Sequence, residues 1–268
     1  MAYPLIHPGS ALNLPAQTCA LVLMAKAPRV GLVKTRLTPE LNAEQAAEAS
    51  RCFIQDMAHN IGELSRDRRL LGAVAFTPAG EESAFDGLLP RNFFLLAQRG
   101  KDLGERLRHA ADDLFAAGFG AVCLINSDSP TLPQSLLKEA AAEAALPGDR
   151  VVLGAASDGG YYLIGLKRPA PHLFSRIDWS TPRVLSQTMM RADEAGLDVV
   201  RLPEWYDVDD WESLKTLYRE IVMPSGSRSS GLQGYKAEAT ARFLRNLVAD
   251  DPDIAKRLAS DSTEQRAP

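Results

Sequence analysis

The residues of this chain best suited to chemistry are a cluster of cationic side chains close to its amino end. Within eleven residues that contain no acidic side chain stand Lys26, Arg29, Lys34 and Arg36. The apolar run 19–25 precedes them and is typical of a buried parallel strand, so the cluster falls at the carboxyl end of that strand. Such a cluster suits a polyanion such as a di- or triphosphate. A solvated basic loop is the alternative interpretation.

Two aspartates further along the chain are candidates for holding a divalent cation. Asp128 follows the apolar run 121–126, and Asp209 belongs to the acidic segment 207–210. A carboxylate at the end of a strand can bind Mg²⁺ or Mn²⁺ through oxygen, and Mg²⁺ commonly bridges to substrate phosphates. Either aspartate could instead serve a turn or a helix start, and Asp210 is expected to cap the last helix.

A further candidate is the turn formed by Asp158, Gly159, Gly160 and Tyr161. Paired glycines permit positive φ angles and a close approach of the backbone, which contact with a sugar or a phosphate would need. Aspartate followed by glycine is equally favourable in a simple β-hairpin, so both interpretations stay open. Asp158 could also act as a base toward an acceptor hydroxyl group.

The elements that must position these residues alternate between strands and helices. Apolar runs predict strands at 19–25, 71–77, 93–97, 121–126, 151–155, 161–166 and 197–202. Helical spacing predicts helices at 43–64, 103–117, 136–145, 182–195 and 210–221. Asn42 is the expected cap of the first of these helices, and Ser180 or Thr181 that of the helix at 182–195, with Pro182 in its first turn. This order predicts an α/β fold with a mostly parallel sheet, whose ligands bind at the carboxyl ends of the strands.

The ends of the chain differ from its middle in composition. Residues 1–18 are expected to form a loose leader, and 19–222 a single α/β domain. Residues 223–268 begin with a Ser/Gly-rich stretch and contain one amphipathic segment at 237–248. This last part is therefore predicted to be a linker with a helical appendage.

Composition excludes several classes of protein. The 268 residues carry a net charge of −4, which disfavours a general nucleic-acid binder. No apolar run approaches the roughly 20 residues of a membrane span, and the start of the chain lacks the charged region of a secretory signal. Three widely spaced cysteines favour a reducing compartment, and the cytoplasm is the expected location.

Known phosphate and hydrolase motifs are missing or misplaced. The pair Gly118 and Gly120 precedes a strand instead of following one, which disfavours a dinucleotide-binding Rossmann site. The segment 31–35 lacks the upstream glycine of a P-loop, and no G-x-S-x-G elbow is present. The four histidines form no zinc-binding pattern.

Taken in order, several motifs resemble those of a known family. They are AKAPRVGLVKTRL, QRGKDLGERL, NSDSPTL, DGGYYLIGL, IDWSTPRVL and YDVDDWESL. The chain between residues 19 and 221 resembles a bacterial glycosyltransferase-A-like family, DUF2064. That family is related to MobA-like nucleotidyltransferases, among them the molybdenum-cofactor and phospholactate guanylyltransferases. The resemblance implies a single-domain nucleotide-diphospho-sugar transferase fold, GT-A and Rossmann-like.

The resemblance also implies roles for individual residues. Residues implied to contact the nucleotide are Ala25, Lys26, Lys34, Arg36, Gln98, Gly100 and Asp102. Asp128 and Asp209 would bind the metal, and the turn from Asp158 to Tyr161 would meet the second substrate. The sequence departs from the family pattern at Arg29-Val30, where many relatives have a second proline, and at Asp210-Trp211 in place of Thr-Pro.

Two reactions are consistent with these residues. A glycosyltransferase would hold a nucleotide-diphosphate sugar while an acceptor attacks the anomeric carbon. A nucleotidyltransferase would hold a nucleoside triphosphate while a phosphate-bearing small molecule attacks the α-phosphorus and pyrophosphate leaves. In both, Lys26, Lys34 and Arg36 would stabilise phosphate charge, together with Mg²⁺ or Mn²⁺. We expect glycosyl transfer, and a nucleotide-binding protein without turnover is a third hypothesis.

Overall fold

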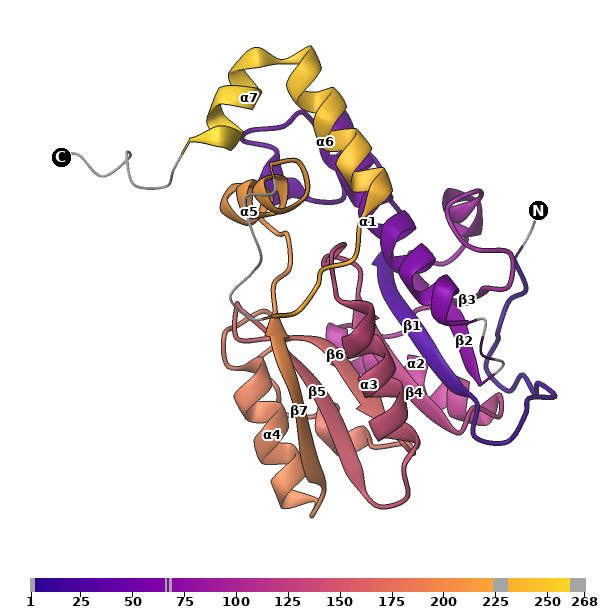
Figure 1. Ribbon diagram of the computed structural model, residues 1–268. Helices are drawn as coiled ribbons and strands as arrows, with labels where there is room; N and C mark the ends of the chain where they lie inside the picture. The colour runs from indigo at the N-terminus through magenta and orange to yellow at the C-terminus, as the bar shows by residue number, and fades with distance from the viewer. Residues whose placement is uncertain (1–2, 66, 68, 224–230, 261–268) are drawn as a thin grey trace.

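The computed structural model describes residues 3–65, 67, 69–223 and 231–260 (Figure 1). Within them, seven strands form one sheet in the order β3-β2-β1-β4-β6-β5-β7. The strands are β1 Cys19–Lys26, β2 Leu70–Thr77, β3 Phe94–Ala97, β4 Ala121–Asn126, β5 Arg150–Ala156, β6 Tyr161–Leu166 and β7 Asp198–Trp205. Only β6 runs antiparallel to its neighbours β4 and β5. The predicted mostly parallel α/β sheet is confirmed.

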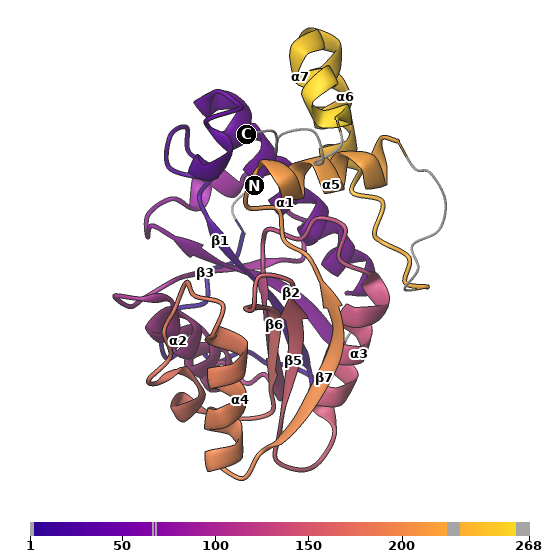
Figure 2. The same cartoon turned by 90° about the vertical axis from the view of Figure 1, so that its left-hand side faces the viewer.

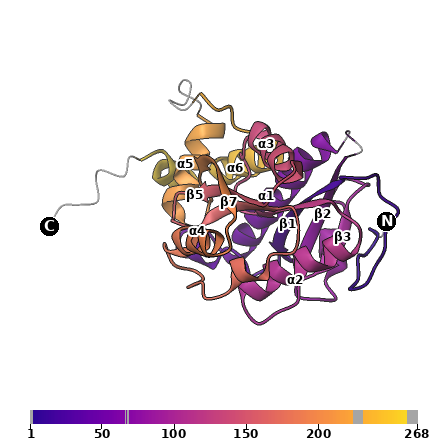
Figure 3. The same ribbon diagram turned by 90° about the horizontal axis from the view of Figure 1, so that it is seen from below.

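Seven helices accompany the sheet in the described part of the chain. They are α1 Ala43–Leu64, α2 Leu103–Ala116, α3 Gln134–Ala145, α4 Val184–Glu194, α5 Trp211–Ile221, α6 Glu238–Asp250 and α7 Pro252–Ala259. Seen from below, α1 and α3 lie on one face of the sheet and α2 and α4 on the other (Figure 3).

The central strands are apolar throughout because both faces of the sheet are covered. In β1, Leu21 and Leu23 belong to the core beneath α1 and α3, whereas Ala20 and Val22 belong to the core beneath α2 and α4. Successive side chains of a strand point to opposite faces, so a strand buried on both sides reads as an unbroken apolar run.

Local capping sets two helix starts where the sequence predicts them. Asn42 accepts a hydrogen bond from the Gln45 backbone N–H, while the Gln45 side chain accepts one from that of Asn42. Asp210 and Ser213 form the corresponding capping box at the start of α5. Each box satisfies backbone donors that the first helical turn leaves without partners.

The predicted start of α4 is wrong. The helix begins at Val184 instead of residue 182, and no side chain caps it. The Thr181 hydroxyl donates to the Asp178 carbonyl oxygen at 2.7 Å, and Ser180 has a left-handed φ of 63°. These residues therefore form a separate turn, and Pro182 lies before the helix.

A third core joins the carboxyl-terminal helices to the rest of the molecule. It includes Leu37, Phe53, Leu217, Leu244 and Leu258, which are all buried. Helix α6 packs along α1, and α7 packs against α5 and α6 (Figures 1 and 2). The sequence analysis did not predict α7, which begins at Pro252 behind the cap Asp251.

The amino-terminal residues lie along the β3 edge of the sheet. Ile6 is buried, and its backbone N–H donates to the Leu95 carbonyl oxygen at 2.8 Å. Among the helices of the described ranges, none combines the length and apolar character needed to traverse a bilayer.

Candidate functional site

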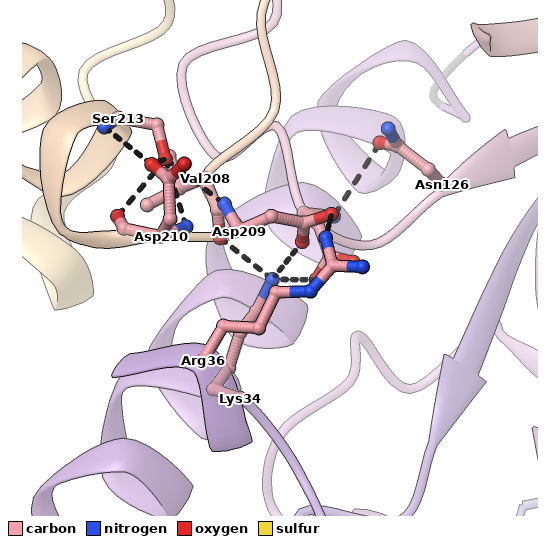
Figure 4. A network of polar contacts seen from close by, with 8 residues as sticks. Lys34, Arg36, Asn126, Val208, Asp209, Asp210 and Ser213 are labelled. Atoms are coloured by element: carbon pink, nitrogen blue, oxygen red, sulfur yellow. Dashed lines mark hydrogen bonds and ion pairs between the residues drawn. The ribbon is translucent and has the colours of Figure 1, made fainter. Parts of the chain in front are cut away.

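Three segments far apart in the sequence meet at the Lys34 side chain. Lys34 Nζ lies 2.7 Å from Asp128 Oδ1 and 3.0 Å from Asp209 Oδ1, and it donates to the Val208 carbonyl oxygen at 2.7 Å (Figure 4). The Lys34 side chain is only 6% exposed, whereas those of Asp128 and Asp209 are 33% and 42% exposed. The ammonium group therefore lies beneath two carboxylates that remain accessible to solvent.

The sheet explains this convergence. Strands β1 and β4 are parallel neighbours with Met24 opposite Asn126, so the loops that carry Lys34 and Asp128 leave the sheet at the same edge. The segment between β7 and α5 is held beside them because the Val208 N–H donates to the Asp128 carbonyl oxygen at 2.8 Å. The fold thus brings together the three residues on which the sequence-based hypothesis depends.

The loop conformation also fixes the base of the Lys34 side chain. Lys34 has a left-handed φ of 48° and precedes the short helical turn Thr35–Leu37. A non-glycine residue in this region is strained and persists only where surrounding contacts hold it. Leu37, three residues on, is fully buried in the third core and anchors the turn.

The electrostatics of the site keep Lys34 charged. Burial by itself would lower its pKa, but the negative charges of Asp128 and Asp209, and their hydrogen bonds to the ammonium, raise the pKa above its ordinary value. A buried lysine without such partners would tend to lose its proton. The two carboxylates are therefore what allow a cation to stay at this depth.

Asp207 is a residue that the site predictions did not include. Burial and the nearby carboxylates of Asp209, Asp158 and Asp128 raise its pKa to about 6. Four acidic groups therefore gather at this edge of the sheet. The signal in the sequence was the run 207–210, in which three carboxylates in four residues repel one another unless a cation or a cap relieves them.

A cavity of about 330 Å³ opens over these groups. Its lining contains five of the predicted residues, Lys26, Lys34, Arg36, Asp128 and Asp209. Arg36 is 73% exposed, and its Nη1 lies 3.9 Å from Asp209 Oδ2. Cations and carboxylates thus face a common space large enough for a small phosphorylated ligand.

Comparison with known proteins supports the sequence-based resemblance. The DUF2064 family, described as uncharacterized proteins conserved in bacteria, matches residues 60–181. A crystal structure from Desulfovibrio desulfuricans G20, of a protein described as a candidate nucleotide-diphospho-sugar transferase, is 31% identical. It covers 90% of this chain and 98% of its own, with a TM-score of 0.74. This chain belongs to the DUF2064 family.

The fold of this DUF2064 protein is accordingly that of the nucleotide-diphospho-sugar transferases, as predicted. A cytidylyltransferase from Leptospira borgpetersenii is 10% identical, covering 89% of this chain and 96% of its own, with a TM-score of 0.48. The inositol-1-phosphate CTP transferase from T. maritima is 12% identical, covering 86% and 97%, with a TM-score of 0.47. No curated protein matches the chain.

Three residues predicted to contact the nucleotide, Gln98, Gly100 and Asp102, lie outside the lining of this cavity. Gln98 Nε2 donates to the Ala75 carbonyl oxygen at 2.7 Å and to that of Ala25 at 3.4 Å. Asp102 caps α2 by accepting from the Glu105 N–H at 2.8 Å. Gly100 has a φ of 135° and packs against Glu105. These residues hold strand and helix ends together, and a nucleotide-binding role for them stays a prediction.

Arg29 also points away from the cavity. Its guanidinium group forms an ion pair with Glu81 in the loop after β2. Of the four cationic residues of the loop, Arg29 is therefore the one that stabilises the loop and does not line the cavity.

The turn between β5 and β6 lies at the same edge of the sheet as Lys34. Asp158 Oδ1 accepts a hydrogen bond from the Gly160 N–H at 2.8 Å. Gly159 has a φ of 90°, and a side chain there would come within 2.3 Å of the Pro182 carbonyl oxygen. Tyr161 packs into the core beneath α4. The turn is thus a tight hairpin, and Asp158 is near enough to Asp207 to raise its pKa.

The donors present fit a hard divalent cation. Asp128 and Asp209 direct one carboxylate oxygen each at a common point, and Mg²⁺ and Mn²⁺ favour such oxygen ligands. In this structure the Lys34 ammonium lies at that point. Across the described ranges, no group of three or more histidine, cysteine, aspartate or glutamate side chains is arranged for a metal.

Proposed function

We propose that this DUF2064 protein is a metal-dependent transferase with a nucleotide substrate, and specifically a glycosyltransferase that uses a nucleotide-diphosphate sugar. The observation that carries the proposal is the meeting of Lys34, Asp128 and Asp209 at the floor of a cavity that Lys26 and Arg36 also line. The name of the 31% identical relative supports the same class of substrate.

Each group has a role in this proposal. Lys26, Lys34 and Arg36 bind the phosphates, because fixed cations at a cavity wall stabilise charge that develops on a leaving group. Asp128 and Asp209 would hold Mg²⁺ or Mn²⁺, which supplies further neutralisation of the departing nucleoside diphosphate when bound. Asp158 takes the proton of the acceptor hydroxyl, and the backbone of the turn from Gly159 to Tyr161 shapes the acceptor side.

Nucleotidyl transfer is the second candidate, and one observation favours it. Three cationic side chains line a single cavity, and a triphosphate offers more negative charge to neutralise than a diphosphate does. In that reaction a phosphate-bearing small molecule attacks the α-phosphorus, and Lys26, Lys34 and Arg36 stabilise the crowded phosphorus centre until pyrophosphate leaves.

Product analysis tests the two reactions against each other. The full chain is incubated with Mn²⁺ in two parallel sets of reactions. One set contains a panel of nucleotide-diphosphate sugars and the other the four nucleoside triphosphates, and both contain hydroxyl- and phosphate-bearing acceptors. Release of nucleoside diphosphate is the expected result. Pyrophosphate as the sole product would establish nucleotidyl transfer instead.

Two variants connect the reaction to the site. Asp128→Asn is expected to lower turnover at least about 100-fold, because it removes the charge of a proposed metal ligand. Asp149→Asn is the matched control, because Asp149 is an exposed aspartate that pairs with Arg168 at the other end of β5. Nucleotide affinity that needs no metal and survives Asp128→Ala, without any product, would make the protein a nucleotide binder that has lost turnover.

A further inference from the structure

The Lys34 ammonium makes the contacts that a metal at Asp128 and Asp209 would need. It lies within 3.0 Å of one oxygen from each carboxylate and donates to the Val208 carbonyl oxygen as well. These are hard oxygen donors from three positions around one cation, and two of them are the proposed metal ligands. The amino group of Lys34 is thus the resident cation of the site.

A divalent ion cannot share this position with the ammonium. Mg²⁺ and Mn²⁺ bind carboxylate oxygens at about 2.1 Å, well inside the distances that Lys34 keeps. An ammonium group that stayed within 3 Å of the same oxygens would be pressed against the ion, and two positive charges at such a distance repel strongly. Where the ion takes these same two oxygens, one cation must leave for the other to bind.

We propose that Lys34 and a divalent metal ion alternate on the carboxylates of Asp128 and Asp209. Before the metal binds, Lys34 offsets part of the negative charge of the two carboxylates. When the metal binds, the Lys34 ammonium moves into the cavity toward the phosphates of the nucleotide. This inference rests on the proposed function, because it takes Asp128 and Asp209 to be the metal ligands.

The surroundings permit the exchange. Lys34 and both carboxylates line the same cavity, so the ion can reach the oxygens and the ammonium can leave on the same side. The carboxylates are 33% and 42% exposed, although the lysine beneath them is 6% exposed. The flexible stem of lysine can redirect its charge while the backbone stays fixed at the turn Thr35–Leu37.

The local charge favours the exchange. Asp207 lies close to Asp209, Asp158 and Asp128, so one ammonium leaves much of the negative charge without compensation. Arg36 contributes little because it is 73% exposed and 3.9 Å away from the nearest carboxylate oxygen. A doubly charged ion balances the four acids better than lysine alone.

The exchange has a consequence for the order of binding. Metal alone must displace a well-paired lysine and therefore binds weakly. A nucleotide gives the displaced ammonium a new anionic partner, so metal and nucleotide each strengthen the binding of the other. Lys34 is then the residue that couples the two sites.

Titration with Mn²⁺ alone, in the absence of nucleotide, tests the proposal on the full chain. Bound and free Mn²⁺ are separated by the electron paramagnetic resonance signal of the free ion. Lys34→Gln is expected to lower the apparent Kd for Mn²⁺ about tenfold or more, a coupling of ordinary size. Lys34→Arg, which keeps a cation on the carboxylates, is expected to stay close to the natural chain.

Arg36→Gln is the matched control, because it removes one positive charge beside Asp209 without freeing the contacted oxygens. It is expected to change the Kd for Mn²⁺ by less than about threefold, as fits an exposed charge pair. If Lys34→Gln binds Mn²⁺ no more tightly than the natural chain, or only as tightly as Arg36→Gln, the exchange is wrong.

A thermal readout covers the case in which Lys34→Gln folds poorly. Added Mn²⁺ is then expected to raise its Tm much more than that of the natural chain, and an equal rise would also overturn the exchange. The outcomes separate this inference from the proposed function. If Lys34→Gln gains Mn²⁺ affinity but the natural chain releases neither nucleoside diphosphate nor pyrophosphate in the product analysis, the exchange stands and the transferase is refuted.

Discussion

At the scale of single residues, the site is governed by how one buried cation is paired. Lys34 stays charged because two carboxylates and a carbonyl oxygen replace its lost hydration. Arg29 and Lys26 belong to the same cationic cluster, yet Arg29 pairs with Glu81 and Lys26, the last residue of β1, is exposed at the cavity wall. Equivalent charges in one sequence motif thus have different roles, decided by what lies opposite them.

Removing the Lys34 charge is expected to destabilise the metal-free protein. Lys34→Met leaves Asp128 and Asp209 facing each other without their cation, and we expect a loss of about 2–3 kcal/mol. Solvent access to both carboxylates keeps the loss below that of a fully buried pair. Urea unfolding in the presence of a chelator measures it. Lys26→Met, at the exposed end of β1 beside the same cavity, is the control, and an equal effect of the two variants would contradict the assignment.

Asp207 is expected to make stability depend on pH. Its pKa is raised to about 6 by burial and by the neighbouring acids. Between about pH 4 and pH 6, the folded state keeps a proton on Asp207 that the unfolded state has already released. The free energy of unfolding therefore falls as pH rises through that window. Asp207→Asn removes the fall and is expected to gain up to about 2 kcal/mol above pH 7.

Urea unfolding of Asp207→Asn at pH 4 and pH 7.5, without metal, checks the sign of this effect. The gain should be present at pH 7.5. It should be absent at pH 4, where the natural Asp207 side chain is protonated in the folded state and is therefore neutral, as asparagine is. Asp193→Asn, on the exposed side of α4, provides the control. A gain of the same size at both values of pH would show that charge is not its cause.

At the scale of elements, helix α6 is tied to α1 by a cap from outside its own sequence. Asp56 of α1 accepts hydrogen bonds from the backbone N–H groups of Ala239 and Thr240 at 2.9 and 2.7 Å. The residue before the helix, Ala237, supplies no side-chain cap. The start of α6 therefore depends on a residue about 180 positions earlier in the chain.

Asp56→Ala is expected to lower stability by about 1–2 kcal/mol, as the loss of a good helix cap does. Asp56→Asn keeps one acceptor oxygen and should lose less. The two variants are compared by urea unfolding monitored by circular dichroism at 222 nm. If both lose equally, the charge of Asp56 matters and its acceptor geometry does not.

At the scale of the whole molecule, the carboxyl-terminal helices share a core with the candidate site. Leu258 of α7 and Leu244 of α6 are buried in the cluster that contains Leu37, three residues after Lys34. Arg257 of α7 forms an ion pair with Glu40 in the same region. Residues 223–268 were expected to form a linker with a helical appendage. In the structure, α6 and α7 share a buried core with Leu37 of the turn that follows Lys34.

Leu258→Ala is expected to cost about 2–4 kcal/mol, as truncation of a fully buried leucine does. Because the third core joins α7 to α1 and α5, tryptophan fluorescence and circular dichroism should report one shared transition at a lower urea concentration. Leu146→Ala, at an exposed leucine after α3, should leave the midpoint unchanged. Two separate transitions would mean that α6 and α7 unfold as an independent unit.

What the amino-acid sequence determines about this protein is the identity and order of its elements. Buried strands such as β4, and α1 with its Asn42 cap, are encoded by patterns within a few residues, so 121–126 and 43–64 were predicted as the structure has them. The edge of the sheet at which a site was expected followed from the strands running parallel, because their carboxyl ends meet. Helix α7 was not predicted, because its two buried residues, Ile254 and Leu258, form too short a pattern on their own.

The tertiary structure alone decides which partner each chemical group has. No local pattern shows that Lys34 lies beneath Asp128 and Asp209, that Arg29 turns to Glu81, or that Gln98 is occupied by strand carbonyl oxygens. These contacts join residues between 23 and 175 positions apart, and their geometry depends on how strands and helices pack. Burial and pairing, which set the charge of Lys34 and Asp207, are therefore properties of the folded chain.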